Sequence, residues 1–290
     1  MKASIHKKRI RIADSILYGL IQFSSFLSIA LLVLFIGYIF IQGVPHFSFS
    51  YLVQSTSILK DTVGILPNII NTLYLMVLTL LIAVPISLGG AIYLNEYAKN
   101  KLLIEVLSST TEVLAGIPSI IYGLFGMLFF GELMHFQYSI LTGALTMAIM
   151  ILPILTRNTQ LALQTVPKSY REAALGMGST KWYMIKTVLL PCSIPGILTG
   201  IILAMGRIIA ESAALLFTAG SVSAMPTGFF HHILSSGATL TIQLYLEMAK
   251  ANYESAFVIA MVLIIIILLL NYLAKWITSH FDVHKERKEG

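Results

Sequence analysis

Three charged side chains lie within apolar stretches of the chain, where a charge is energetically costly. Arg207 and Glu211 are four residues apart within 193–219, and Glu112 lies within 106–130. A charge at the centre of a bilayer costs about 2.5–3.5 kcal/mol on insertion scales, so each of these side chains should face protein or water. A guanidinium offers a planar fork that matches the oxygens of a phosphate-like anion. The spacing places Arg207 and Glu211 on one helix face, either as part of an anion path or as a self-neutralising packing pair.

Glu112 also has two interpretations. It follows the polar run Ser108-Ser109-Thr110-Thr111, so it is either part of the same path or a charge at the boundary of its stretch. His231 and His232 have no neighbour at metal-ligand spacing, and we expect them to be surface or packing residues and no metal to bind. The sequence contains no P-loop pattern, so any ATP must be hydrolysed by another chain.

The stretches that carry these charges are long enough to cross a membrane. A transmembrane helix needs about 20 mostly apolar residues. Strand-like alternation is absent, and only helices and closed barrels can span hydrocarbon. With 57% hydrophobic and 11% charged residues, against about 25% charged in soluble domains, the composition predicts an all-α integral membrane protein. Six spans qualify: Ile16–Ile41, Pro67–Leu94, Val106–Phe130, Tyr138–Leu155, Ser193–Ala219 and Ser255–Ile277.

The basic residues indicate the orientation of these spans. Sixteen of the 19 Lys and Arg residues lie in the two tails, at the end of the sixth span, or in the loops after the second and fourth spans, whereas only Lys60 and Lys250 lie on the opposite side. By the positive-inside rule both termini and the loop 157–191 are cytoplasmic, and 42–66 and 220–254 are outside. The net charge of +6 is therefore explained by topology, and we expect no nucleic-acid partner.

The spans predict one transmembrane domain over residues 1–290. Its expected parts are a tail at 1–15, the first span and its outer loop at 16–66, a five-span core at 67–277, and a tail at 278–290.

The cytoplasmic loop has the pattern of a short helix, a glycine turn and a second helix. Ser169 and Glu172 have the spacing of a capping box, which starts a helix. Gly178 fits the left-handed position that ends one. The following Ser-Thr pair can cap a second helix, which Pro191 would terminate. A short helix held below the bilayer suits docking of another protein; the alternative is a capped loop in which Glu172 serves only as a cap.

The full spacing of this loop resembles the EAA loop of ABC importer permeases, E-A-A-x3-G-x9-I-x-L-P. The resemblance implies that the loop helix fits a groove on an ATP-hydrolysing subunit and transmits its motion. It assigns this coupling to Glu172, Ala173, Ala174 and Gly178. The sequence departs from the motif only at Val188, which replaces Ile. The matching positions are Glu172, Ala173, Ala174 and Gly178, followed by Val188-x-Leu190-Pro191.

Three other segments are similar to the phosphate-specific, PstA-type subgroup of that family. They are 91–97 (AIYLNEY), 116–126 (GIPSIIYGLFG) and 206–220 (GRIIAESAALLFTAG). The last departs from the family's G-R-x-x-G-E-T-A-P-L-L-F-T at Ala210, Ser212 and Ala214, and the missing proline leaves a helix bend at 214 open. The resemblance covers roughly residues 60–275.

This resemblance implies a type I ABC importer permease fold and a phosphate importer in a bacterial or archaeal plasma membrane. Apart from lipid, the implied partners are a second, PstC-like permease subunit, two PstB-like ATPase subunits and an outer PstS-like phosphate-binding protein. ATP–Mg would be bound by the ATPase, and no cofactor by this chain. The alternatives are another oxyanion such as molybdate or sulfate, a stand-alone ion-coupled transporter or channel, and a membrane-embedded enzyme. The EAA spacing speaks against the transporter, and the enzyme would need clustered catalytic residues that the sequence lacks.

Overall fold

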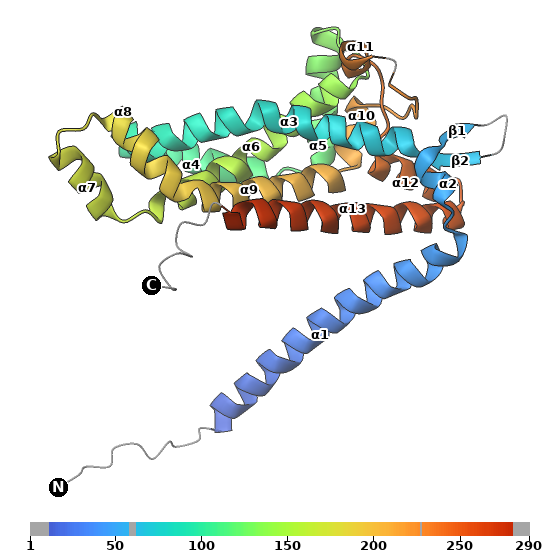
Figure 1. Cartoon of the computed structure of the whole chain (residues 1–290), viewed down its shortest axis with the longest axis horizontal. Helices are drawn as coiled ribbons and strands as arrows, with labels where there is room; N and C mark the ends of the chain where they lie inside the picture. Colours follow the sequence, from blue (N-terminus) through green and yellow to red (C-terminus); the bar gives the residue numbers. More distant parts are fainter. Residues whose placement is uncertain (1–11, 58–61, 227, 281–290) are drawn as a thin grey trace.

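The computed structural model describes residues 12–57, 62–226 and 228–280, and it is helical apart from one small hairpin (Figure 1). Lys60 and the basic residues of the tails up to Arg11 and from Lys285, which helped to set the orientation, lie outside these residues.

The elements follow one another from an outlying first helix to a long last helix. The first part comprises α1 (Ile12–Gly43), a turn at Val44–His46, α2 (Phe49–Val53), the antiparallel strands β1 (Ser55–Ser57) and β2 (Thr62–Ile65), and α3 (Leu66–Ile92) with a wider final turn at Tyr93–Tyr97. The middle part comprises α4 (Lys101–Gly116), α5 (Ser119–Gly126) with a turn at Met127–Leu133, α6 (Ile140–Gln164) and α7 (Lys168–Gly176). The last part comprises α8 (Lys181–Met184), a wider turn at Ile185–Leu189, α9 (Leu190–Ala210), α10 (Ala213–Thr218), α11 (Phe229–Ile233), α12 (Leu240–Ala249) and α13 (Tyr253–His280).

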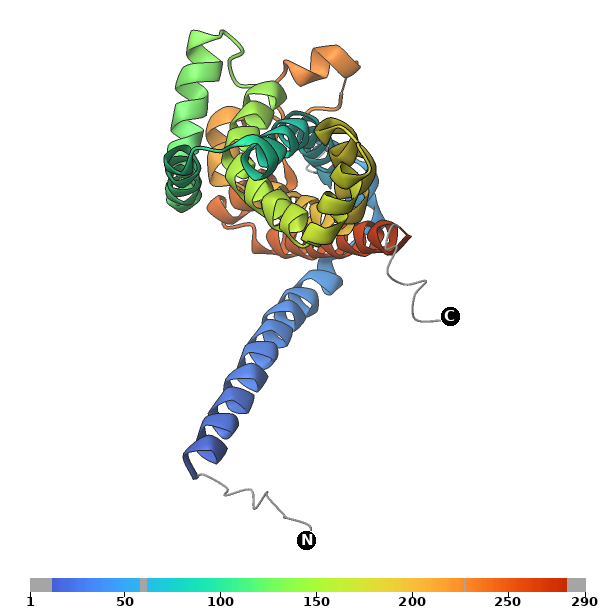
Figure 2. The same ribbon diagram turned by 90° about the vertical axis from the view of Figure 1, so that its left-hand side faces the viewer.

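The bundle is built around α3, α6 and α9, with α13 along one side (Figure 2). Its largest apolar cluster includes the fully buried Leu75, Met147, Ile151 and Ile208. Small residues bring α6 and α9 together: a Cβ added at Gly196 would lie 2.6 Å from Ala162 Cβ. A Cβ added at Gly200 would likewise lie 2.9 Å from Asn158 Cβ, so these small residues, four apart on α9, form a helix-packing surface.

Helix α1 leaves the bundle (Figures 1 and 2). It meets α13 only near its end, where the Tyr38 and Phe257 rings pack edge to face with 5.7 Å between their centres. The rest of α1 is apolar and exposed, as expected of a helix that faces lipid or another subunit.

Five helices are long and apolar enough to cross a membrane, and a bent pair of helices is the sixth candidate. The all-helical membrane fold is therefore confirmed, but Val106–Phe130 is not one continuous helix. Helix α4 ends at Gly116, and α5 departs at 97°. The reason lies in Pro118, because the residue before a proline is driven out of the helical region; Ile117 is extended, with ψ 130°.

The predicted span Ser193–Ala219 also differs from the structure at both ends. Helix α9 stops at Ala210, and Glu211 is extended, although no proline follows at 214. At the other end, Pro191 does not terminate the preceding helix. The Leu190 N–H bonds to the Ile185 carbonyl five residues earlier, and this wider turn accommodates a proline that cannot donate.

The two ends of the bundle carry different segments. Helices α7 and α8 lie at one end, the end toward which α13 runs, and α2, the β1–β2 hairpin and α12 lie at the other (Figure 1). This arrangement agrees with the expectation that 157–191 and the segments 42–66 and 220–254 face opposite sides of the membrane.

Candidate functional site

A Schellman motif ends α7 at the predicted glycine. Gly178 has φ +84°, its N–H bonds to Leu175 O at 3.0 Å, and Ser179 N–H bonds to Ala174 O at 3.2 Å. This is the six-to-one and five-to-two pattern of a left-handed helix end. A Cβ at position 178 would meet nothing within 4 Å, so the glycine is required by the backbone and not by crowding.

The predicted capping box is wrong. Pro167 precedes the first helical residue, Lys168, and no side chain caps the helix. Proline fixes a backbone angle suited to a helix start, which moves Ser169 into the first turn. Glu172 is therefore exposed without serving as a cap. The predicted cap of the second helix is present, since Thr180 Oγ1 accepts a bond from Tyr183 N–H at 3.3 Å.

The coupling residues differ in which way they face. Glu172 and Ala173 are exposed, whereas Ala174 packs into an apolar cluster with Ile92, Leu163 and Ile185. Met177 is 84% exposed, and Tyr170 and Leu175 of the same loop helix are exposed as well. Exposed apolar side chains that gather in one place are typical of a contact surface. We define the α7 surface as the exposed residues Tyr170, Glu172, Ala173, Leu175 and Met177.

Arg207 and Glu211 are brought together, but not on one continuous helix. Arg207 Nη2 lies 3.9 Å from Glu211 Oε2, and the two side chains are 49% and 6% exposed. Glu211 lies in the break after α9, where its Oε1 accepts from Ala214 N–H at 3.1 Å and its carbonyl from Thr241 Oγ1 at 2.8 Å. The carboxylate therefore caps the first turn of α10, and the guanidinium remains half-exposed beside it.

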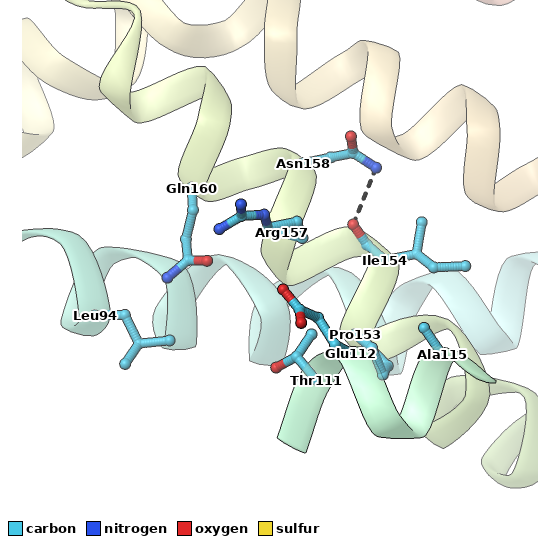
Figure 3. Close-up of a pocket in the computed structure, with 9 residues that line it drawn as sticks. All are labelled: Leu94, Thr111, Glu112, Ala115, Pro153, Ile154, Arg157, Asn158 and Gln160. Carbon is cyan, nitrogen blue, oxygen red and sulfur yellow. Dashed lines mark hydrogen bonds between the residues drawn. The ribbon is translucent and has the colours of Figure 1, made fainter. Parts of the chain in front are cut away.

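Glu112 lies in a different place, in a cavity of about 220 Å³ between α4 and α6. Figure 3 shows the Glu112 carboxylate at the same side of this cavity as the polar ends of Arg157 and Gln160. Asn158 also lines it and donates to Ile154 O at 3.0 Å. Arg157 ends the apolar run that predicts the fourth span, yet α6 continues to Gln164, so this arginine belongs to the helix and not to the loop.

A buried polar network at the beginning of α3 is not apparent from the sequence pattern. Asn71 accepts from His232 Nε2 at 2.6 Å and donates to Ala238 O at 3.1 Å. His232 is buried, and burial first, with the neighbouring His231 second, lowers its pKa. His232 is thus a packing residue and the exposed His231 a surface one. The only sequence signal is the pair of asparagines at the start of an apolar span.

Comparison with known proteins identifies the family. The model of the binding-protein-dependent transport system inner membrane component matches residues 86–284. The probable ABC transporter permease protein YqgI of Bacillus subtilis (strain 168) is 39% identical over 210 residues, 72% of this chain and 71% of that protein. The phosphate transport system permease protein PstA 2 of Mycobacterium bovis is 33% identical over 237 residues, 81% and 78%.

Solved structures show the same fold. A chain of a bacterial alginate ABC transporter, solved in complex with its pentasaccharide-bound periplasmic protein, gives a TM-score of 0.65. The match is 16% identical and covers 94% of this chain and 95% of that chain. The chain therefore belongs to the binding-protein-dependent transport system inner membrane components, as a multi-pass, non-catalytic permease subunit of an ABC importer that works with an ATPase and a binding protein.

Proposed function

We propose that this chain is the PstA-type permease subunit of a phosphate importer. The observation that carries the proposal is the half-exposed guanidinium of Arg207 in the last turn of a membrane-spanning helix. The 33% identity to a phosphate permease supports the same cargo.

Arg207 is suited to bind an oxyanion reversibly. At 3.9 Å its contact with Glu211 is longer than a hydrogen bond, and Glu211 is already engaged with Ala214 N–H. The guanidinium therefore keeps donors for a tetrahedral anion, which it can bind through two parallel bonds. The adjacent carboxylate weakens anion binding by repulsion, which favours release.

The cavity that contains Glu112 and Arg157 is the proposed inner part of the same path. Helices α6 and α9 run antiparallel, with Gly200 against Asn158. Arg207 is seven residues beyond Gly200, so it lies about 10 Å further along the bundle than Arg157. An anion that moves inward would pass the two arginines in turn, and Glu112 would prevent its retention at the second.

The proposed coupling uses the α7 surface. Glu172, Ala173 and Gly178 would hold this surface in a groove of an ATPase subunit, while Ala174 fixes the helix to the bundle. The complete importer would contain a second, PstC-like permease subunit, two PstB-like ATPase subunits that bind ATP–Mg, and a PstS-like phosphate-binding protein. That protein would deliver phosphate to the segments 42–66 and 220–254.

The test is reconstitution of the chain in vesicles with its co-expressed partners. The binding protein is offered phosphate, molybdate or sulfate, and both ATP hydrolysis and uptake of the radiolabelled anion are measured. We expect phosphate alone to stimulate both. Stimulation by molybdate or sulfate instead would change the cargo and retain the permease function, because a guanidinium fork accepts any of these tetrahedral oxyanions.

A further inference from the structure

One ion pair connects the proposed coupling loop, residues 157–191, to the end of α3. The proposed function does not use this ion pair. Arg171 belongs to α7, and its Nε lies 3.3 Å from Glu96 Oε1 in the final turn of α3. The two side chains are only 18% and 8% exposed. Charges this far from water attract each other more strongly than a surface pair, so this contact can hold two elements together.

Arg171 also binds the end of α6. Its Nη2 donates to Leu163 O at 2.8 Å and its Nη1 donates to Val166 O at 3.3 Å. These carbonyls belong to a helix end, where backbone acceptors lack helical partners. One guanidinium therefore joins three elements: the helix that carries it, the end of α6 and the end of α3.

Glu96 is held from several sides as well. Asn95 Nδ2 donates to Glu96 Oε1 at 2.7 Å. Lys181 of α8 donates to the Glu96 carbonyl, and its ammonium lies 4.8 Å from the centre of the Tyr97 ring. Both helices of the coupling loop therefore contact the same turn of α3.

The opposite end of α3 is bonded to the outer segment 220–254. Asn68 Nδ2 donates to Ser223 Oγ at 2.9 Å and to Ala238 O at 3.0 Å, and Thr72 Oγ1 accepts from Leu240 N–H at 3.0 Å. Helix α3 and its final turn form one helical element of 32 residues, about 48 Å long. A single helical element thus links the proposed coupling loop with the segment 220–254.

We propose that Glu96 and Arg171 are positioning residues that make α3 and the coupling loop move as one body. A displacement of the α7 surface by the ATPase would then reach the outer segment through α3. This inference rests on the proposed function, and it adds that transmission depends on a contact within this subunit that is separate from the surface that docks the ATPase.

The experiment compares variants in the complete importer, reconstituted in vesicles with phosphate-loaded binding protein. Glu96→Gln removes the charge but keeps the size and the backbone carbonyl that Lys181 contacts. Arg171→Lys keeps the charge but loses the fork that reaches three acceptors. Glu105→Gln, at an exposed position of α4 near the same end of the bundle, is the matched control. Phosphate uptake and ATP hydrolysis are measured in the same vesicles, and their ratio is the readout.

We expect the amount of phosphate transported per ATP to fall about tenfold in both variants. Glu96→Gln leaves a buried charge unpaired and Arg171→Lys loses hydrogen bonds of a charged group, and either loss typically changes an equilibrium by at least that factor. Glu105→Gln should keep the ratio of the unmodified complex. ATPase subunits should remain bound in all three, because the α7 surface is unchanged.

A second measurement is independent of the transported anion. Spin labels are attached through Ser169→Cys, which is exposed on α7 outside the α7 surface, and Tyr93→Cys, also exposed, in a Cys192→Ser background. A narrow distribution of label distances is expected in the unmodified complex, with and without ATP, and a broad one in Glu96→Gln.

The proposal is overturned if both variants transport phosphate per ATP within twofold of Glu105→Gln. It is also overturned if uptake and hydrolysis fall together at a constant ratio, because that result indicates a purely structural defect. If Glu96→Gln does not assemble, Arg171→Lys decides in both measurements. If the unmodified complex takes up no phosphate, the proposed function fails, while the label distances still support or contradict the connection between α3 and α7.

Discussion

At the scale of single residues, the sequence shows which side chains could form a polar site, but not which of them contact one another. An arginine and a glutamate within an apolar span predict a polar site, and the structure does bring Arg207 and Glu211 within 3.9 Å. The capping of α10 by Glu211 could not be predicted, because it depends on a helix break that the sequence, without a proline at 214, left open. Arg171 and Glu96 are likewise joined only by tertiary packing.

Substitution of Arg207 separates the two interpretations of the pair. Arg207→Lys should lower phosphate uptake about tenfold although the charge is kept, because an ammonium lacks the planar fork. Arg207→Gln/Glu211→Gln removes both charges, and the glutamine amide oxygen can still accept the Ala214 N–H bond. If the pair only packs, this double variant restores both assembly and uptake, since a buried ion pair can often be replaced at little cost. If Arg207 binds the anion, assembly recovers and uptake does not. Near-normal uptake by the assembled double variant would exclude Arg207 from the path.

His232 gives the outer segment a predictable dependence on pH. Its pKa is lowered by burial and by His231, so the folded protein favours the neutral ring, which donates from Nε2 to Asn71. The stabilisation is complete above the unfolded pKa of about 6.5 and is lost as the pH falls through the lower folded pKa. We expect the melting temperature of the purified protein to fall between pH 7 and pH 5, and to fall less in His232→Gln. An equal pH dependence in the two proteins would contradict this assignment.

At the scale of elements, the points at which helices begin, end or break could be predicted where a single residue determines them. Gly178 and Thr180 occupy the predicted positions, and Pro118 breaks its span. The capping box failed because the helix begins at Lys168, directly after Pro167, two residues earlier than it would with Ser169 as its cap. The hairpin β1–β2 was not expected at all, since strands of three and four residues leave too little periodicity in the sequence.

The turn at Gly178 provides a test of the coupling loop. Gly178→Val should destabilise the end of α7 by about 1–3 kcal/mol, because a β-branched residue is strained at φ +84°. Gly178→Asn is the matched control, since asparagine tolerates the left-handed region. We expect Gly178→Val to retain fewer ATPase subunits in pull-downs from membranes, and Gly178→Asn to retain nearly the normal amount. The coupling role is wrong if both variants bind the ATPase and transport equally well at equal membrane content.

At the scale of the whole molecule, five of the six predicted spans correspond to continuous helices and the sixth to a bent pair. These spans and the two ends of the bundle could be predicted, because they depend on apolar length and on where basic residues gather. The departure of α1 from the bundle could not, because it depends on which helices pack together. Pro118 indicates a break between α4 and α5, but the 97° angle at that break also depends on packing. The sequence therefore identifies each charged residue of the proposed path separately. Their positions along the bundle axis follow only from how α6 and α9 pack side by side.

The orientation of the whole molecule can be tested with single cysteines in a Cys192→Ser background. Ser50→Cys and Ser221→Cys probe exposed positions of the outer segments, and Met177→Cys probes the α7 surface. The basic residues concentrate on the α7 side, and the structure places α2 at the opposite end of the bundle (Figure 1). An impermeant maleimide should therefore label Ser50→Cys and Ser221→Cys in intact cells, and Met177→Cys only after the membrane is permeabilised. Labelling under denaturing conditions controls for access to each thiol. Strong labelling of Met177→Cys in intact cells would reverse the orientation, and would place the proposed ATPase contact on the wrong side of the membrane.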